Sequence, residues 1–380
     1  MPTLENYTFA DAVEYHYGRF PPNNLDYGKL IGPLRKAASA IARYDAVLNS
    51  LHNKDLLLAP IHRQEAVVSS RMEGTVATLD ELLTYEAEDN LNEDALNRNR
   101  LYRKEILEVH SYVRALVYAQ RQISEGLPLC NRLIKHTHGR LLFFGRGADK
   151  QPGNFKKDQN YIADNAKKKI LFIPIGPSHL DGALQKFENF INEDTIDPLI
   201  RTAIAHIEFE ALHPFKDGNG RVGRMLITLM LWQTGLISGP HFYISGNLEQ
   251  KKEEYIDRMR AVSSHDAWTE WVIFFLEAAE KQAEDNLKVA EEVLALYEKM
   301  KEEFRMRLAS QWTVNALDYI FSKPVFKNSD FTSKSGIPKA TAIRFTKVLA
   351  DDELLTTISP ASGRRSAVYA FEPLLRIVRA

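Results

Sequence analysis

Residues 198–230 read PLIRTAIAHIEFEALHPFKDGNGRVGRMLITLM, and this stretch decides the fold. Apolar side chains recur at helical spacing up to Leu212, and Pro214 then ends the pattern. A second apolar stretch with the same spacing follows Gly220. The sequence therefore predicts an amphipathic helix over 198–212, a short loop and a second helix, within a mainly α-helical chain.

The turn into the second helix has the composition of a phosphate-binding site. Glycines at a helix N-terminus leave backbone amides open to an anion, and no Cβ blocks its approach. Two arginines follow on nearly the same side of the first turn, where the helix dipole disfavours cations unless a polyanion is bound. The candidate phosphate-binding residues are Gly218, Asn219, Gly220, Arg221, Val222, Gly223 and Arg224, with Val222 and Gly223 expected to pack.

Two side chains just before this turn could supply chemistry. Asp217 offers hard oxygen ligands to a Mg²⁺ ion that the phosphates would share. His213 titrates near neutral pH, so we expect it to act as the general base for a hydroxyl that attacks the α-phosphorus.

Two other nucleotide-binding motifs do not fit this segment. Residues 218–223 match GxGxxG, but that fingerprint requires a preceding β-strand and an acidic residue about 20 positions later. Here a helix precedes the glycines, and residues 238–245 contain no acid. GxxxxGK(S/T) is absent as well, which excludes a P-loop NTPase.

The pattern HxFx(D/E)GNGRxxR fits residues 213–224 at every defined position, so the chain resembles the Fic (filamentation induced by cAMP) family. The resemblance extends over about residues 30–280. It implies a helical Fic bundle and the transfer of AMP from ATP to a Ser, Thr or Tyr hydroxyl of a protein target or of the enzyme itself. Tyr255 lies where family members often place an aromatic ring against the nucleotide.

Residues 69–74, SSRMEG, match the family pattern (S/T)xxxE(G/N), which marks an autoinhibitory helix. The resemblance assigns this role to a helix over about 60–74, with Ser69 on the same face as Glu73 and with Glu73 paired to Arg224. A carboxylate there would compete with the γ-phosphate for the guanidinium. In some members the same glutamate helps to hydrolyse the AMP-protein bond, and the sequence leaves this alternative open.

Residues 167–180, KKKILFIPIGPSHL, predict a β-hairpin closed by Gly176 and Pro177. By resemblance this is the flap that presents the target, with Phe172, Ile173 and Ile175 as docking residues. An ordinary two-stranded lid is the alternative. The preceding PGNFKKDQNYI is similar to the family's PGxFRxxQxWI, with Lys156 and Tyr161 in place of Arg and Trp.

Length and composition limit the number of domains, the class of partner and the cellular compartment. The 380 residues, 44% of them hydrophobic, suffice for two or three domains, and the net charge of −1 favours neither nucleic acid nor acidic membranes. The single Cys130 suits a reducing compartment, and neither a signal peptide nor a membrane-spanning run is evident, so we expect a cytoplasmic protein. The expected regions are an N-terminal helical part over 1–125, a catalytic core over 126–280, a connecting helix over 281–310 and a last domain over 311–380.

The last 70 residues resemble a winged helix. Lys339, Thr341 and Arg344 would lie on its recognition helix, and Arg364 and Arg365 in its wing. Residues 311–380 hold ten Lys and Arg against six Asp and Glu, a moderate excess for a DNA reader, so DNA contact and protein contact both stay open. The charged helix over 277–308 could join domains or build a homodimer. Two rival functions remain, a transcription regulator that senses nucleotide and a Fic-fold enzyme with other chemistry, such as phosphotransfer or AMP removal.

Overall fold

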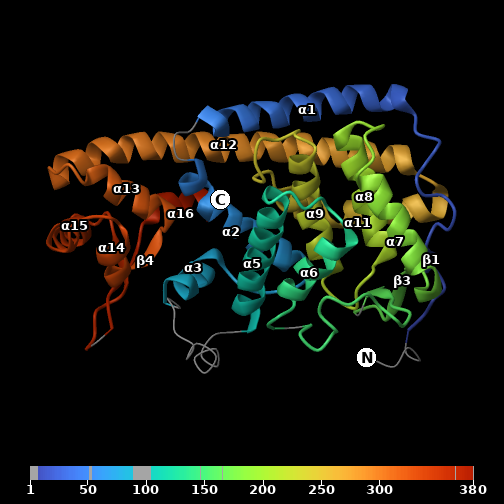
Figure 1. Cartoon of the computed structure of the whole chain (residues 1–380), viewed down its shortest axis with the longest axis horizontal. Coiled ribbons are helices and arrows are strands. Elements are labelled where there is room, and N and C mark those ends of the chain that lie inside the picture. The colour runs from blue at the N-terminus through green and yellow to red at the C-terminus, as the bar shows by residue number, and fades with distance from the viewer. Residues whose placement is uncertain are drawn as a thin grey trace. The chain divides into compact units, whose positions relative to one another are not determined.

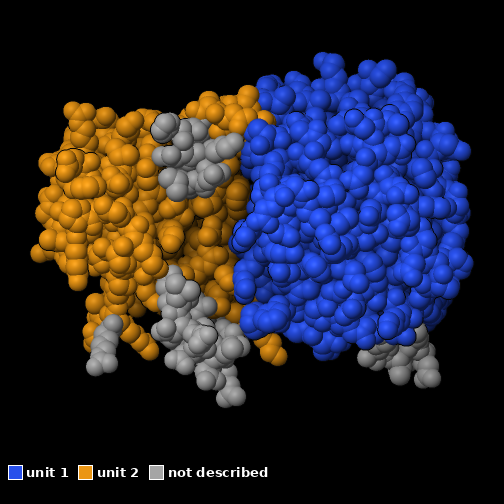
Figure 2. Space-filling model, viewed as in Figure 1, with its two compact units in different colours: residues 1–43, 111–284 blue, residues 44–110, 285–380 orange. Residues whose placement is uncertain are grey.

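The computed structural model describes residues 7–50, 54–88, 104–145, 147–164, 166–363 and 365–379. Helices dominate these ranges, as the sequence predicts, and small sheets accompany them (Figure 1). The chain divides into a first compact unit, residues 1–43 with 111–284, and a second, residues 44–110 with 285–380 (Figure 2). Among the described helices, none has both the length and the apolar character needed to cross a membrane.

The first unit holds residues 198–230, the two predicted helices and the loop between them. Its own elements are β1 Val13–Glu14, α6 Asn131–Leu141, β2 Ile162–Asp164, β3 Lys169–Ile173, α7 Pro177–Ile191, α8 Pro198–Leu212, α9 Asn219–Gln233, α10 Ser245–Gln250 and α11 Lys252–His265. Helices α1 Tyr27–Ser50, α5 Lys104–Ser124 and α12 Trp268–Leu308 each have residues in both units.

Helix α8 is the centre of the first unit, packed against α7 and α9. The Asp197 carboxylate caps its N-terminus by accepting from the amides of Leu199 and Ile200, and Pro198 occupies the first helical position. The bounds match the prediction, but the prediction of an amphipathic helix is wrong. Polar residues such as Thr202 and Glu208 are buried along with the apolar ones, so α8 is covered by protein on nearly every side.

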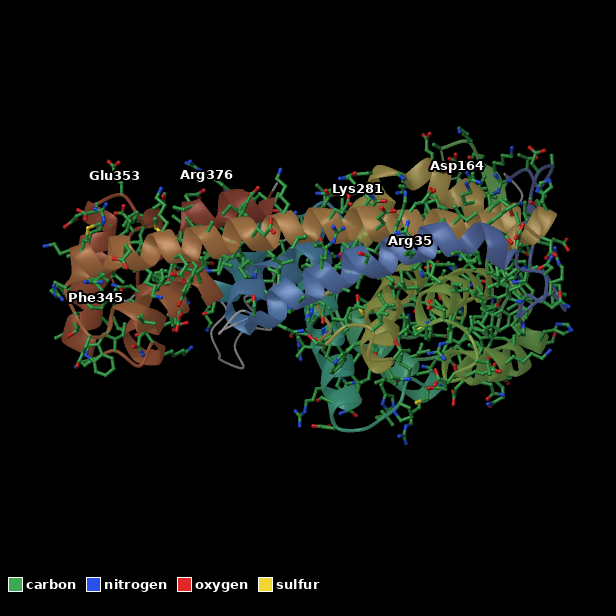
Figure 3. All side chains as sticks on the ribbon, turned by 90° about the horizontal axis from the view of Figure 1, so that it is seen from above. Arg35, Asp164, Lys281, Phe345, Glu353 and Arg376 are labelled. Carbon is green, nitrogen blue, oxygen red and sulfur yellow. The ribbon has the colours of Figure 1, made fainter. Side chains whose placement is uncertain are left out.

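Helices α1 and α12 begin together and run alongside one another (Figure 3). The backbone amide of Asp26 donates to the Thr269 hydroxyl, which ties the residue before α1 to the start of α12. Helix α12 starts at Trp268 rather than at 277, because Trp268, Trp271 and Phe275 extend its buried stripe towards the N-terminus.

The chain before α1 is anchored by a buried polar network. Tyr15 donates to a Glu208 carboxylate oxygen at 2.7 Å, and His16 Nε2 contacts the other oxygen at 2.8 Å. His16 Nδ1 is 2.7 Å from the Ser263 hydroxyl. Because these groups are buried and hydrogen-bonded to one another, they hold the N-terminal segment against α8 and α11.

The sheet of the first unit has the order β1-β3-β2, with β1 parallel and β2 antiparallel to β3. A hairpin is present, but the prediction that Gly176 and Pro177 close it is wrong. The hairpin joins β2 to β3, and the Asp164 carboxylate accepts from the amides of Ala166 and Lys167 in its turn. Gly176 is instead the N-cap of α7, with Pro177 at the first position, where a residue without an N–H is well suited.

The second unit includes α2 Lys54–Met72, α3 Leu79–Glu88 and the C-terminal elements. Helix α2 ends as predicted before Gly74, whose φ of 87° is in the left-handed region that favours glycine. A capping box opens α3: the Thr78 amide donates to Glu81, and the Glu81 amide donates to the Thr78 hydroxyl.

The C-terminal elements follow the order expected for a winged helix, a helix, a helix-turn-helix and two strands. The added strand β4 completes a sheet of order β4-β6-β5. Lys339 and Arg344 are exposed on α15, and Arg365 is exposed between β5 and β6, whereas Arg364 lies outside the described residues. The elements are α13 Thr313–Ser322, β4 Val325–Lys327, α14 Asn328–Lys334, α15 Lys339–Asp351, β5 Thr356–Ser359, β6 Val368–Ala370 and α16 Glu372–Arg379.

Candidate active site

His213 is the C-cap residue of α8 and has a left-handed backbone, with φ of 44°. Its ring nitrogen Nδ1 is 3.3 Å from the backbone oxygen of Glu210. A carbonyl oxygen can only accept, so this contact requires the proton on Nδ1 and leaves the lone pair on Nε2. The neutral ring therefore has the tautomer that a general base acting through Nε2 needs.

Amide side chains hold the loop after His213 in one conformation. Asn219 accepts from the Phe215 amide at 2.8 Å and donates to the Phe215 carbonyl at 2.9 Å. Asn160, from the segment before β2, donates to the carbonyls of His213 and Phe215 at 2.9 and 3.0 Å. These bonds satisfy buried backbone groups and fix the loop that carries the imidazole.

The buried side chain of Lys156 also forms hydrogen bonds that hold the end of α8 before this loop. Its ammonium donates to the Leu212 carbonyl at 3.0 Å and to the Asn160 side chain at 2.7 Å, and only 4% of the residue is exposed. Burial lowers the pKa of Lys156 to about 7, because the charged form loses hydration. This position, where the resemblance expects arginine, thus links the end of α8 to Asn160.

Helix α9 begins with a glycine as its N-cap. Gly218 has a φ of 77° and has no side chain that could compete for the first amides of the helix. Arg221 is fully buried and Arg224 is 4% exposed, both within the first turns. Removing two guanidinium groups from water is costly, and a bound polyanion would offset that cost. The arrangement therefore suits the phosphates of a nucleotide.

Gly223 is a packing position, as predicted. A Cβ built there would lie 2.4 Å from a carboxylate oxygen of Glu210 and 3.3 Å from the Phe209 ring. The absence of a side chain lets α8 and α9 approach closely. Val222 is likewise 1% exposed.

Asp217 lies between the imidazole and the helix start. Its Oδ1 accepts from the Gly218 amide at 2.6 Å and is 3.6 Å from a terminal nitrogen of Arg221. The side chain is 26% exposed, so solvent can reach it. A single accessible carboxylate fits a Mg²⁺ ion, because this ion is usually held by one or two carboxylates together with substrate phosphates and water.

His138 of α6 forms the floor beneath Asp217. Its Nδ1 accepts from the Gly153 amide at 2.9 Å, and its Nε2 donates to the Asp217 carbonyl at 2.9 Å. The ring also stacks on Phe215, with centroids 3.6 Å apart. Burial lowers the pKa of His138 to about 4, which keeps the ring neutral and able to accept and donate at once.

His206 and Tyr255 form a buried hydrogen-bonded pair that contacts the backbone of α9 at Gly223. The Tyr255 hydroxyl donates to His206 Nε2 at 2.7 Å, and His206 Nδ1 is 3.3 Å from the Gly223 carbonyl. Complete burial lowers the pKa of His206 to about 3, and the charge of Arg224 adds to the effect. Tyr255 is 4% exposed, so its predicted contact with the nucleotide stays a prediction.

Comparison with known proteins decides the family. The model of the Fic/DOC family N-terminal region matches residues 31–121, and the Fic/DOC family model matches residues 128–231. The chain belongs to the Fic/DOC family. The loop between α8 and α9 lies within the second match, so this family membership covers the candidate site.

Relatives carry the name protein adenylyltransferase Fic. The one from Drosophila sechellia is 30% identical over 124 residues, which are 32% of this chain and 23% of the relative. The one from Drosophila erecta is 25% identical over 252 residues, which are 60% of this chain and 46% of the relative. The chain therefore spans less than half the length of these relatives.

Solved Fic structures share the fold. A Fic family protein from Desulfovibrio desulfuricans G20 aligns with a TM-score of 0.58 and 16% identity over 92% of this chain and 98% of its own. Fic-1 (residues 134–508) from C. elegans aligns with a TM-score of 0.54 and 20% identity over 70% of this chain and 74% of its own.

The predicted inhibitory residues lie in the second unit. Ser69 is fully buried within α2, and Glu73 directly follows Met72, the last residue of that helix. The Glu73 amide donates to the Ser70 carbonyl at 3.1 Å, and Gly74 continues the turn. The pairing of Glu73 with Arg224 stays a prediction.

The predicted docking residues of the flap are largely enclosed. Phe172 is 7% exposed and Ile175 is 2% exposed, whereas Ile173 is half-buried. Strand β3 has a partner on each side, so a target peptide that extends this sheet can pair only along the outer edge of β1 or β2. The docking role of these three residues stays a prediction.

The roles of Asn160 and His138 were not predicted from the sequence. Asn160 contacts a loop that is 53 residues away in the chain, and no local pattern announces such a contact. His138 joins Gly153 to Asp217, and no sequence motif assigns it this role. The PGNFKKDQNYI segment was the available signal, because several polar residues in an otherwise buried loop must find partners.

Proposed function

We propose that this Fic protein transfers AMP from ATP to a hydroxyl of a protein. The observation that carries the proposal is the loop between α8 and α9, where a histidine with its lone pair on Nε2 is followed by a glycine-capped helix start and two buried arginines. Base and anion site are thus joined by a few residues that Asn160 and Asn219 hold in place.

The chemical step follows from these groups. The oxygen of a Ser, Thr or Tyr side chain attacks the α-phosphorus, and the bond from that phosphorus to the pyrophosphate oxygen breaks. His213 Nε2 accepts the hydroxyl proton. The amides of 218–220 and the guanidinium groups of Arg221 and Arg224 hold the phosphates, so that pyrophosphate can leave opposite the incoming oxygen.

Asp217 would hold Mg²⁺ through its accessible carboxylate. When bound, the ion neutralises part of the phosphate charge. The Gly218 amide and Arg221 already contact this carboxylate, so its orientation is set by the loop itself.

Glu73 is proposed to restrain the reaction, with the buried Ser69 fixing the end of α2 that presents it. A carboxylate paired with Arg224 would occupy the position of the γ-phosphate and leave ATP in a pose that is wrong for in-line attack. Removal of AMP from a modified protein is the alternative role for the same glutamate.

Labelled ATP tests the proposal. Glu73→Gly should raise protein labelling from α-labelled ATP by about tenfold or more, since one charge-assisted contact is worth roughly 1.5–3 kcal/mol. Adding His213→Ala should abolish the labelling. Transfer of the γ-label instead would favour a phosphotransferase, and an unchanged Glu73→Gly signal would remove the inhibitory role.

A second candidate function is favoured by the C-terminal elements. Exposed Lys339, Arg344 and Arg365 on a helix-turn-helix and its wing could contact DNA phosphates, with the Fic loop as a nucleotide sensor. A promoter-fragment gel shift that persists in His213→Ala would favour this reading. The cytoplasmic location and a homodimer through α12 remain proposals beside it.

A further inference from the structure

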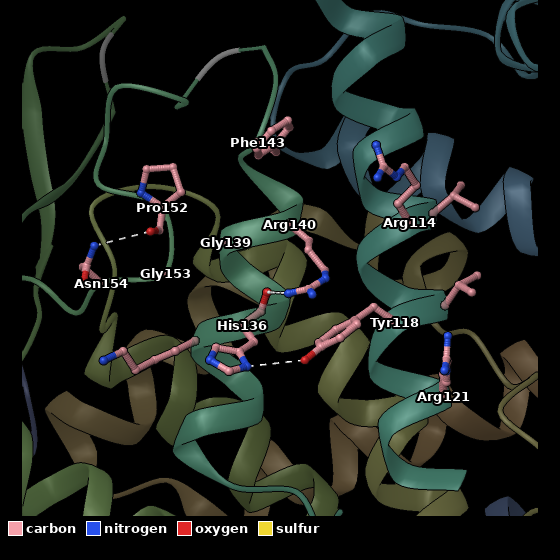
Figure 4. A pocket seen from close by; sticks show the side chains of 13 residues that line it. Arg114, Tyr118, Arg121, His136, Gly139, Arg140, Phe143, Pro152, Gly153 and Asn154 are labelled. Atoms are coloured by element: carbon pink, nitrogen blue, oxygen red, sulfur yellow. Dashed lines mark hydrogen bonds between the residues drawn. The ribbon is translucent and has the colours of Figure 1, made fainter. Parts of the chain in front are cut away.

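A large groove lies on the outer side of α6, within the first unit (Figure 4). It measures about 840 Å³, which is within the range of ligand clefts. One wall is α5 and the other is α6, and residues 152–154 close one end. We call this the α5–α6 groove. Its lining is Val113, Arg114, Val117, Tyr118, Arg121, Lys135, His136, Gly139, Arg140, Phe143, Pro152, Gly153 and Asn154.

The α5–α6 groove is strongly basic. Three arginines, a lysine and a histidine line it, and no carboxylate does. Arg121 pairs with the exposed Glu125, but Arg114, Lys135 and Arg140 form no ion pair with any residue in the described part of the chain. The whole chain has a net charge of −1, so this local excess creates a positive field that attracts an anionic ligand.

Part of this charge is held in position. The Arg140 guanidinium lies 3.4 Å above the Tyr118 ring and donates to the His136 carbonyl at 3.1 Å. Tyr118 is in turn 3.4 Å from His136 Nδ1. These contacts bridge the two walls and reduce the entropy that Arg140 would lose on binding a ligand.

The α5–α6 groove also offers apolar surface. Phe143 is 65% exposed and Val117 is 56% exposed, and both line the groove. Val113 and Pro152 lie in the same lining. A matching ligand therefore carries apolar groups as well as negative charges.

The backbone of the residues that line the α5–α6 groove does not favour the binding of a compact phosphate. Its helical residues begin at Val113 in α5 and at Lys135 in α6, well after the start of either helix, so no helix N-terminus among the lining residues offers unpaired amides. The Gly153 amide already donates to His138 Nδ1. Arg140 covers a face of Tyr118 on which a base could otherwise stack.

We infer that the α5–α6 groove binds an extended acidic segment of a partner protein, in which carboxylates alternate with apolar side chains. Separated cations suit separated carboxylates, and the exposed Phe143 and Val117 suit the intervening side chains. Binding of this segment requires no transfer reaction. Only the identification of the partner with the target of AMP transfer rests on the proposed function.

Fluorescence anisotropy on the full chain without ATP tests this inference. The probe is a labelled peptide in which glutamate alternates with valine, and its counterpart has glutamine in place of glutamate. The double variant Arg114→Gln with Arg140→Gln should weaken binding of the acidic probe roughly tenfold, because the loss of each exposed charge weakens it a few-fold and the two effects combine. The matched control is Arg132→Gln, which changes an exposed arginine of α6 outside the groove. It should change the affinity for the acidic probe by less than about twofold.

Several results would overturn the inference. If the wild type and the double variant bound the acidic probe with equal affinity, the probe would bind outside the groove. If the wild type bound the glutamine and glutamate probes equally well, negative charge would not be what the groove recognises. Tighter binding of a labelled oligothymidylate, lost in the same double variant, would assign the groove to nucleic acid. Thermal melting of each variant shows whether a loss reflects unfolding, and Arg114→Lys should retain most of the affinity because the charge is kept.

Discussion

The arginines on the two sides of helix α6 are placed in opposite environments. The inner face contributes the neutral His138, which joins Gly153 to the carbonyl of Asp217 in the loop between α8 and α9. The outer face contributes Lys135 and Arg140, which line the α5–α6 groove. Arg221 and Arg224, at the start of α9 after this loop, are buried, whereas the arginines of the groove are exposed.

Burial explains what each face can do. Charges in a dry, fixed environment interact strongly with a ligand and cost little to reorganise, which favours chemistry on one defined group. Exposed charges are screened by water and salt and contribute little each, which favours docking of an extended chain. Substitutions should therefore have large, specific effects at the loop and small, additive effects at the groove.

The largest effect is expected at His213. His213→Ala should lower the rate of AMP transfer about 10²- to 10⁴-fold, because the hydroxyl loses its general base. The rate is measured from α-labelled ATP in the Glu73→Gly background. His265→Ala, which changes an exposed histidine at the end of α11, is the matched control. A comparable fall in the control would show that the loss is not specific to the loop.

Asn160→Ala should have the next largest effect. It removes the donors to the carbonyls of His213 and Phe215, so the imidazole loses its fixed position. We expect the transfer rate to fall about 10- to 100-fold and the free energy of unfolding to fall by roughly 1–3 kcal/mol. Urea denaturation and rate measurements check this, with the exposed Asn49→Ala as the control. An unchanged rate would show that the loop is rigid without this clamp.

Acid should destabilise the inner face of α6. The pKa of His138 is about 4 in the folded chain and near 6.5 when unfolded, so the unfolded state binds more protons between these values. Its stabilising contribution is complete above pH 6.5 and is lost as the pH falls towards 4. At pH 5 the free energy of unfolding should be lower by roughly 2 kcal/mol from this group. Urea midpoints at pH 7 and 5 should differ less in His138→Gln, and an equal difference would contradict the assignment.

The smallest effect is expected when the outer face is altered. Arg114→Gln with Arg140→Gln should change the dissociation constant of Mg-ATP by less than about twofold, since exposed charges contribute little at a distance. Isothermal titration calorimetry measures this constant. A large loss of ATP affinity would mean that the two faces of α6 do not act separately.

Local patterns in the sequence predicted the frame of the site. Periodic apolar residues and Pro214 predicted the bounds of α8, and the glycine turn predicted the start of α9. Each signal acts within a few residues, where capping and periodicity are strong.

Long-range contacts could not be predicted in the same way. The Gly176-Pro177 pair is compatible both with a turn and with a helix start, and only the pairing of β1 and β2 with β3 decides between them. Asn160 and His138 acquire their roles from partners 53 and 79 residues away. The α5–α6 groove combines residues from Val113 to Asn154, and its charges become a cluster only when the two helices are adjacent.

A crystal structure of the Glu73→Gly protein with Mg²⁺ and a non-hydrolysable ATP analogue tests the central claim most directly. The account predicts the phosphates against the amides of 218–220 and the guanidinium groups of Arg221 and Arg224, with His213 Nε2 facing the α-phosphorus. A nucleotide bound elsewhere, or a loop that leaves no room for the phosphates, would contradict it.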